Sequence, residues 1–329
     1  MSDLPPPLPS SPSSSAPKSW ERATLEKLVF AALKEQRAAR RWKIGMRIVS
    51  MLFFLGVIWV MALRSPDAAG VNTTSLEPHT AVVEISGVIA EEADANARDV
   101  ISNVKRAFEN TNAKAVLLRI NSPGGSPVQA GIINDELLRL KKQHKKPLYA
   151  VVGDSCASGA YYIAVAADRI FVDKASVVGS IGVIMGGFGF TGAMEKTGIE
   201  RRLLTAGDNK GLMDPFSPVD PAQQAHMQGM LNQIHQQFID VVRTNRGSRL
   251  KENPDIFSGL VWTGQQAVQL GLVDELGNID SVARDVVKQE KIVDYTRRDN
   301  VAERLAKKFG ASVGAGAVQA LQMHAVDMR

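Results

Sequence analysis

The sequence predicts an α/β fold with a mainly parallel sheet, preceded by a single N-terminal transmembrane helix. Apolar runs such as 115–120 and 148–152 are typical of buried strands, and helical segments separate them along the chain. Strands that alternate with helices are joined by right-handed crossovers, which set them parallel. The third observation is the uncharged run Ile48–Leu63, which is longer than a buried strand. The chain therefore has an anchor and one α/β domain.

The N-terminal part divides into a disordered, basic segment at residues 1–43 and a transmembrane anchor at residues 44–63. Residues 1–17 are rich in proline and serine and bury too little apolar surface to fold. The anchor follows a basic cluster, which by the positive-inside rule keeps the N-terminus in the cytoplasm and the rest of the chain outside. A cleaved signal peptide is the alternative. The long N-terminal region and the lack of an Ala-x-Ala site after Leu63 speak against cleavage.

Beyond a linker at residues 64–79, the sequence predicts a folded domain over residues 80–290 and a C-terminal tail over residues 291–329. Turn residues and apolar periodicity locate the elements of the domain. Strands are expected at 81–89, 115–120, 148–152, 169–172 and 182–184, and helices at 95–110, 127–143, 161–167 and 221–243.

The charge distribution argues against nucleic acid as a partner. Residues 1–47 hold nine Lys or Arg and four Asp or Glu, which accounts for the whole net charge of +5. The remaining chain is neutral overall, without the basic excess that nucleic-acid binding requires. No pattern of metal ligands or cofactor-binding residues stands out, so no metal or cofactor is expected.

Two segments about thirty residues apart predict the chemistry. Each follows a predicted strand: the Pro-Gly-Gly turn of residues 121–125, and residues 157–162, where Ser158 lies among small residues before an apolar helix. Glycine leaves backbone N–H groups accessible, and a helix start leaves its first N–H groups unpaired. A serine beside two sources of free N–H groups provides a nucleophile and an oxyanion hole, which predicts a hydrolase. Cys156 is interpreted as a small buried residue rather than a thiol nucleophile.

The residues alone leave the general base open. The five histidines are His79 in the linker, His144 in a lysine-rich run, His226 and His235 on the long helix, and His324 in the tail. None lies in a glycine-rich turn of the kind that builds sites. A desolvated lysine can replace histidine by accepting the serine proton as a neutral amine. Lys210 lies in a glycine-punctuated loop, although by itself it has the pattern of a surface lysine.

The chain resembles the signal peptide peptidase A family of membrane-anchored serine proteases over residues 80–290. The motifs that carry this resemblance are Ser-Pro-Gly-Gly at 122–125, Ala-Ser-Gly-Ala-Tyr-Tyr at 157–162, Gly-Ser-Ile-Gly-Val at 179–183, Ala-Gly-Asp-Asn-Lys at 206–210, and residues 261–274.

The resemblance implies a crotonase/Clp-protease-like spiral fold and a Ser/Lys dyad. Ser158 would be the nucleophile, Lys210 the general base, and Ser180 the hydroxyl that orients Lys210. Gly125 and Gly159 would offer the oxyanion-hole N–H groups, with Gly124 shaping the turn.

The resemblance also implies where the protein acts and on what. It places the protein in the bacterial inner membrane, as a homo-oligomeric ring whose subunits share active sites and degrade cleaved signal peptides. The apolar segment 181–185 and the loop 186–189, with Phe188 and Phe190, predict an apolar wall near Ser158.

Two positions depart from the family pattern. Ala160 replaces a common glycine, a mild change that leaves the turn intact. Leu260 replaces an arginine that usually precedes Val-Trp-Thr-Gly, so any ion pair or subunit contact of that arginine is in doubt.

Three alternative functions remain. A Clp-type Ser-His-Asp protease needs a histidine about 25 residues after the serine, and the stretch around Val183 has none. A crotonase acting on acyl-CoA would use the oxyanion hole without Ser158 or Lys210. A non-catalytic membrane-tethered scaffold would use Ser158 only for packing and would not react with an acylating probe.

Overall fold

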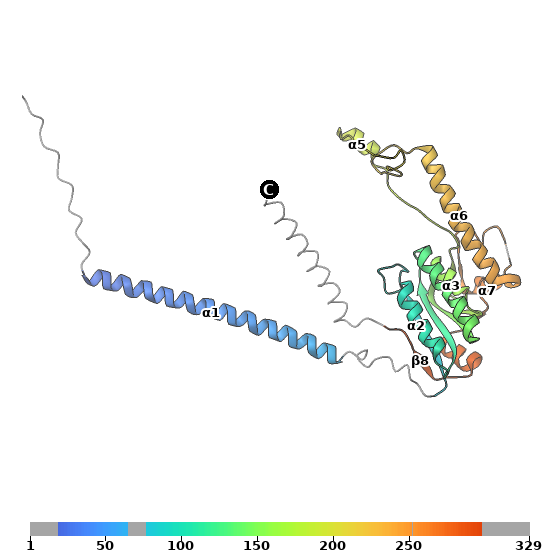
Figure 1. Ribbon diagram of the computed structural model, residues 1–329, viewed down its shortest axis with the longest axis horizontal. Helices are drawn as coiled ribbons and strands as arrows, with labels where there is room; N and C mark the ends of the chain where they lie inside the picture. Colours follow the sequence, from blue (N-terminus) through green and yellow to red (C-terminus); the bar gives the residue numbers. More distant parts are fainter. Residues whose placement is uncertain (1–18, 65–76, 252, 298–329) are drawn as a thin grey trace, which may run out of the picture. The chain divides into compact units, whose positions relative to one another are not determined.

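The computed structural model describes residues 19–64, 77–251 and 253–297, and the chain forms two units (Figure 1). One unit comprises residues 1–68 and 299–329, and the other comprises residues 69–298. The predicted disordered segment 1–17, most of the linker 64–79, and the tail beyond residue 297 lie outside the described residues.

The first unit contains one long helix, α1 (Ser19–Arg64). Residues 19–43, which were expected to belong to a disordered basic segment, are therefore helical. Large apolar side chains along its second half are exposed, including Phe53 and Trp59 at 67% and 66%. Within the described residues, no helix is both long enough and apolar enough to cross a membrane. The transmembrane anchor expected at residues 44–63 therefore stays a prediction.

The second unit is a mixed α/β domain, as the alternation of strands and helices predicts. In chain order its elements are β1 (His79–Ser86), α2 (Ala97–Glu109), β2 (Ala113–Ser122), α3 (Pro127–His144), β3 (Leu148–Ala157), α4 (Gly159–Ala164), β4 (Arg169–Val172), β5 (Val177–Gly179), α5 (Thr191–Thr197), α6 (Pro221–Arg246), the 3₁₀ turn η2 (Gly247–Arg249), β6 (Val261–Thr263), α7 (Gly264–Gln269), β7 (Glu275–Leu276), α8 (Ile279–Ser281), the π-helical turn η3 (Val282–Val287) and β8 (Ile292–Asp294).

One eight-stranded sheet organises the domain, and its main path has the order β6-β5-β3-β2-β1-β8. Strand β4 pairs with β3 and β7 beside this path. All pairings are parallel except that of β5 with β6. The carboxyl ends of β2 and β3 are neighbours, so the segments that follow these two strands meet at one edge of the sheet.

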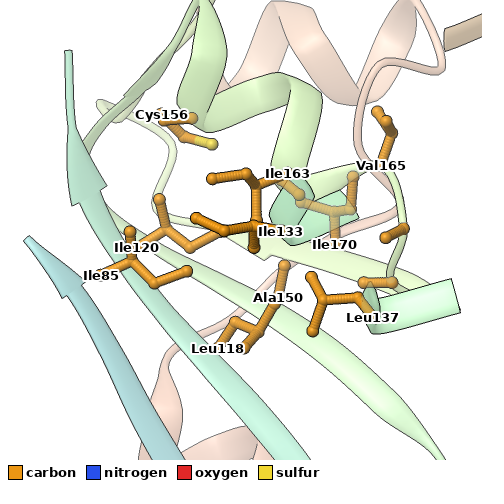
Figure 2. Close-up of a cluster of buried hydrophobic side chains, with 14 of the residues drawn as sticks. Ile85, Leu118, Ile120, Ile133, Leu137, Ala150, Cys156, Ile163, Val165 and Ile170 are labelled. Atoms are coloured by element: carbon orange, nitrogen blue, oxygen red, sulfur yellow. The ribbon is translucent and has the colours of Figure 1, made fainter. Parts of the chain in front are cut away.

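The main core lies between one face of the sheet and the helices. Figure 2 shows side chains from β1, β2 and β3, such as Ile85, Leu118 and Ala150, meeting Ile133 and Leu137 of α3 and Ile163 of α4. The Cys156 side chain points into the same apolar cluster and is fully buried. Burial raises the pKa of the Cys156 thiol, because the low-dielectric interior disfavours the thiolate. Cys156 is thus a packing residue.

The structure corrects three boundaries of the sequence analysis. No strand forms at 182–184. The strand lies instead at Val177–Gly179, because Ser180 takes a φ of 53° and turns the chain out of the sheet. His79, expected in the linker, belongs to β1, is buried, and lies 2.9 Å from the Tyr295 hydroxyl through Nε2. The first residues of the expected tail form β8, which pairs with β1.

A buried ion pair joins the end of α6 to the core. Arg246, with 1% of its side chain exposed, donates two hydrogen bonds to the Asp274 carboxylate at 2.8 and 3.0 Å. The backbone N–H of Ile170, in β4, also donates to Asp274 at 2.7 Å. Burial acts to raise the pKa of Asp274, but the hydrogen bonds and charge of Arg246 hold that pKa below its ordinary value of 3.8. The pair fixes α6 against the sheet, a role that the sequence did not reveal.

We expect Arg246→Met to lower the free energy of unfolding by up to about 3 kcal/mol, because it leaves the Asp274 carboxylate with only the half-exposed Arg249, at 3.2 Å, as its cationic partner. A carboxyl group whose pKa is lowered by folding stabilises the fold above its unfolded pKa, and this stabilisation is lost as pH falls through the folded value. Urea unfolding between pH 7 and pH 3 measures both effects. Asp274→Asn should flatten the loss of stability below about pH 4. An unchanged slope in that variant would contradict the assignment.

Candidate active site

Ser158 lies directly after β3, at the N-cap of α4, in a strained backbone conformation. Its φ and ψ are 53° and −126°, which non-glycine residues rarely adopt. Its N–H donates to the Gly179 carbonyl at 2.8 Å, and its carbonyl accepts from the Tyr162 N–H at 3.0 Å. The side chain makes no capping bond to the helix. These bonds fix the main chain of Ser158 and leave its hydroxyl available.

Ser180 directly follows the neighbouring strand β5, in a position equivalent to that of Ser158 after β3. Ala157 and Gly179 are register partners in β3 and β5, so the two serines follow the sheet at the same level. Ser180 also has a positive φ of 53°, and its N–H donates to the Leu260 carbonyl at 2.8 Å. Leu260 therefore acts through its backbone here, which any residue could supply.

The glycine turn after β2 packs directly against Ser158. A Cβ on Gly124 would lie 2.7 Å from the Ala157 carbonyl oxygen and 2.8 Å from both the Gly159 nitrogen and the Ser158 Cβ. Its φ of 100° also excludes most side chains. Only glycine allows the turn to approach the serine this closely.

Two backbone N–H groups remain available beside Ser158. Within the described residues, neither the Gly125 N–H nor the Gly159 N–H donates a hydrogen bond. The Gly125 nitrogen lies 3.4 Å from the position that a Cβ on Gly159 would occupy, so the two glycines are in contact. Gly159 is the first residue of α4, where helix geometry leaves the N–H without an internal acceptor. The pair has the donors that an oxyanion hole needs.

Hydrogen bonds of three further polar side chains hold this arrangement in place. The Ser122 hydroxyl accepts from the Gly124 N–H at 3.1 Å. Asn121 bonds to both the Ser155 N–H and the Asp154 carboxylate at 3.1 Å, joining the ends of β2 and β3. Asn134, buried in α3, donates to the Tyr162 carbonyl at 2.7 Å and so joins α3 to α4. Asn121 and Ser122 belong to the turn motif, whereas nothing in the sequence singles out Asn134.

Ser158, Ser180, Gly125 and Gly159 line one cavity of about 390 Å³. Among the residues that the structure describes, no charged side chain lines it. Its other walls come from the N-terminal turn of α3, from α4, from α6, and from the loops after β5 and before β6: Pro127, Ala130, Tyr162, Gly182, Val183, Ile184, Ile234, Gln237, Phe238, Ser258 and Gly259. Part of the expected apolar wall is present, but Phe188 and Phe190 lie elsewhere and contact each other, with Phe190 stacked on Phe216.

The structure does not bring Lys210 to this cavity. Lys210 is exposed in the loop before α6, and its N–H donates to the Gly207 carbonyl at 3.1 Å. Asn209 accepts a hydrogen bond from Gln223, in the first turn of α6, at 3.1 Å. Asp214 pairs with Arg201 at 3.2 Å, so this carboxylate is engaged away from Lys210. Lys210 and Ser158 therefore occupy separate parts of the same domain.

We expect Gly124→Ala to lower the free energy of unfolding by about 1–3 kcal/mol, because the new Cβ meets backbone atoms in a positive-φ conformation. Displacement of the Ser158 main chain should also slow labelling by a serine-reactive phosphonofluoridate at least about tenfold. Gly131→Ala is the matched control, since a Cβ on this α3 residue would meet nothing within 4 Å. Equal labelling rates in the two variants would show that the close approach at Gly124 does not matter.

The comparisons with known proteins identify a peptidase family. The sequence model of peptidase family S49 matches residues 140–293. A protein of Synechocystis sp., assigned as a protease, is 31% identical over 204 residues, covering 62% of this chain and 72% of that protein. An Enterococcus faecium protein assigned as the signal peptide peptidase SppA is 29% identical, covering 65% of this chain and 64% of that protein. The chain belongs to peptidase family S49.

The chain is also similar to two proteins with other names. The chain is 39% identical over 225 residues to a Brucella abortus protein named Na(+)/H(+) antiporter NhaA. That match covers 68% of this chain but only 28% of the Brucella protein, so the antiporter name does not extend to this chain. The S97A mutant of the 1510-N membrane-bound stomatin-specific protease superposes with a TM-score of 0.41, at 16% identity, covering 68% of this chain and 96% of that one.

Proposed function

We propose that this protein is a serine endopeptidase in which Ser158 is the nucleophile and Lys210, supplied by a second copy of the chain, is the general base. One observation carries the proposal: a strained serine and two N–H groups without acceptors meet at an uncharged cavity. Membership of family S49 supports the same chemistry. The crotonase/Clp-protease-like spiral implied by the motifs is part of this proposal.

Acyl transfer would use residues at the cavity together with Lys210 of the second copy. The Ser158 oxygen attacks the peptide carbonyl carbon while a neutral Lys210 amine accepts the hydroxyl proton. The negative oxygen of the tetrahedral intermediate accepts hydrogen bonds from the Gly125 and Gly159 N–H groups. The intermediate collapses to an acyl-enzyme, and the protonated lysine gives its proton to the departing amine. Water then attacks the ester by the same route and restores Ser158.

A base from a second copy follows from the length of α6. The Lys210 loop is bonded to the first turn of α6 through Gln223, whereas Ile234 and Phe238 of the same helix line the cavity. At about 1.5 Å per residue, the eleven residues from Gln223 to Ile234 place the loop roughly 16 Å along the helix from the cavity. The amine therefore cannot reach Ser158 of its own chain in this structure. Ser180, which lines the cavity, is suited to orient an incoming amine.

The surface around Lys210 supports assembly with further copies. Helix α5 has no buried residue, and large apolar side chains around it are exposed, including Ile199 at 61% and Leu204 at 98%. Apolar surface of this kind marks an interaction site. We propose that it packs against neighbouring subunits in a homo-oligomeric ring, which delivers Lys210 to the next cavity.

The substrates proposed are cleaved signal peptides and other short apolar peptides. An uncharged cavity with Val183, Ile184 and Phe238 among its lining residues favours apolar side chains and gives no counter-charge to acidic or basic ones. Turnover of a peptide library checks this: equal rates for charged and apolar residues at the cleavage position would count against it.

The proposed location is the bacterial inner membrane, with residues 44–63 as an uncleaved anchor and the peptidase domain on the periplasmic side. The uncharged run 48–63 and the basic cluster before it support this placement. Sequencing of the mature N-terminus tests it. A terminus between residues 64 and 75 would show instead that the segment is a cleaved signal peptide.

A serine-reactive phosphonofluoridate tests the proposed chemistry directly. The purified full-length protein should form one covalent adduct, and mass spectrometry should locate it on Ser158. A crotonase-like acyl-CoA enzyme or a membrane-tethered scaffold on the same fold predicts no adduct at Ser158. Absence of labelling in the assembled protein would therefore overturn the proposed function.

A further inference from the structure

One face of α6 forms a wall of the Ser158 cavity. Ile234, Gln237 and Phe238 are spaced three and four residues apart, so they lie on the same side of the helix, and all three line the cavity. Phe238 packs on Tyr162 of α4, with ring centroids 5.0 Å apart, which fixes this part of α6 beside the helix that Ser158 begins. Gln237 lies between Ile234 and Phe238 on this face of the helix, and it is exposed, so its amide is accessible from the cavity.

The Gln237 side chain is uncommitted, unlike those of Gln228 and Gln236 on the same helix. Gln228 donates to Asn232 at 2.8 Å, and Gln236 donates to Asp240 at 2.9 Å. Within the described residues, the Gln237 side chain makes no hydrogen bond, although its backbone belongs to α6. Of the other polar side chains at the cavity, Ser258 donates to the Asp255 carbonyl at 2.7 Å, Ser158 and Ser180 have proposed roles in the chemistry, and Tyr162 offers a hydroxyl rather than an amide. Gln237 is thus the amide available to a bound substrate.

We infer that Gln237 is a substrate-binding residue that recognises the peptide main chain, an inference that rests on the proposed peptidase function. A carboxamide carries one acceptor and two donors, which match the N–H and C=O of a backbone amide. Such a contact is independent of side-chain sequence. It adds a main-chain contact away from the Gly125 and Gly159 N–H groups, so that a cavity without charged side chains can hold apolar peptides of varied sequence.

The test compares Gln237→Met, which keeps the length of the side chain but removes its amide, with Gln236→Met as the matched control on the adjacent, exposed position. Substrates are an apolar peptide and a set of depsipeptides, in each of which an ester oxygen replaces one backbone N–H. A single-residue ester serves as a reference without neighbouring peptide bonds. We expect Gln237→Met to lower kcat/KM for the peptide about three- to tenfold more than for this ester, mainly through KM. The control should match the wild type.

The depsipeptides identify the contacted group. One of them should be cleaved more slowly than the peptide by the wild type but not by Gln237→Met, because the variant has already lost the hydrogen bond. Equal effects of Gln237→Met on the peptide and the single-residue ester, or no effect on either, would overturn the inference while phosphonofluoridate still labels Ser158. Failure of the wild type to label would instead overturn the peptidase proposal itself.

Discussion

Ser158→Ala is expected to lower kcat/KM for peptide cleavage on the order of 10⁴-fold or more and to abolish covalent labelling by a phosphonofluoridate. The variant removes the only atom that can form the acyl-enzyme in the proposed mechanism. Alanine fits the space that Ser158 occupies. Because residue 158 stays at a φ of 53° in both proteins, the variant has the same backbone strain as the wild type and should fold with similar stability. Peptide hydrolysis, labelling and thermal unfolding of the full-length protein measure the three properties.

Cys156→Ala and Ser180→Ala distinguish the role of Ser158 from the roles of the two nearby nucleophilic side chains. Cys156 is buried in the core, so its loss should cost stability while labelling at Ser158 persists. Ser180→Ala should slow catalysis without removing the labelled residue, because Ser180 is proposed to orient the base. Full peptidase activity in Ser158→Ala, or an adduct that moves to Ser180, would contradict the assigned nucleophile.

The sequence could predict the centre of the candidate site because it depends on strand order. Two consecutive parallel strands place the segments after their carboxyl ends side by side, so the turn at 121–125 and Ser158 had to meet if β2 and β3 are neighbours. The motifs themselves contain the glycines that this contact needs, as the close approach of Gly124 to Ser158 shows. Their catalytic roles stay predictions.

Other features depend on long-range packing that local sequence does not encode. The segment 182–184 is as apolar as a strand, yet it follows the positive φ of Ser180 and forms part of the cavity. His79 is buried because Tyr295, more than two hundred residues later, lies against it. Arg246 is one arginine among many in the sequence and becomes a buried partner only where α6 meets Asp274. The last two cases are decided by contacts with residues that are distant in the sequence.

Substitution of Lys210 is expected to have the second large effect on catalysis. Lys210→Arg should lower kcat/KM at least about 10²-fold, although it keeps the positive charge, because a guanidinium stays protonated and cannot accept the Ser158 proton. In the wild type the pH dependence of the rate should lack the inflection near pH 6.5 that a histidine base would give. Steady-state kinetics from pH 6 to pH 10 checks both. Substantial activity in Lys210→Arg would direct attention back to the histidines, of which His235 is bonded to the Ile181 carbonyl near the cavity.

Co-expression of Ser158→Ala and Lys210→Ala chains decides whether the base comes from another copy. Neither chain alone has a complete dyad. If each cavity combines Ser158 of one chain with Lys210 of its neighbour, random assembly of equal amounts restores about a quarter of the sites. If both residues must come from the same chain, no site is restored. The control mixture combines Ser158→Ala chains with Lys196→Ala chains instead of Lys210→Ala chains. Lys196 is an exposed residue of α5, so its substitution leaves both Ser158 and Lys210 intact in that chain. Recovery of activity in the co-expressed pair would therefore show that the exposed Lys210 loop completes the cavity of a neighbouring subunit, whereas an inactive mixed assembly would refute the shared site.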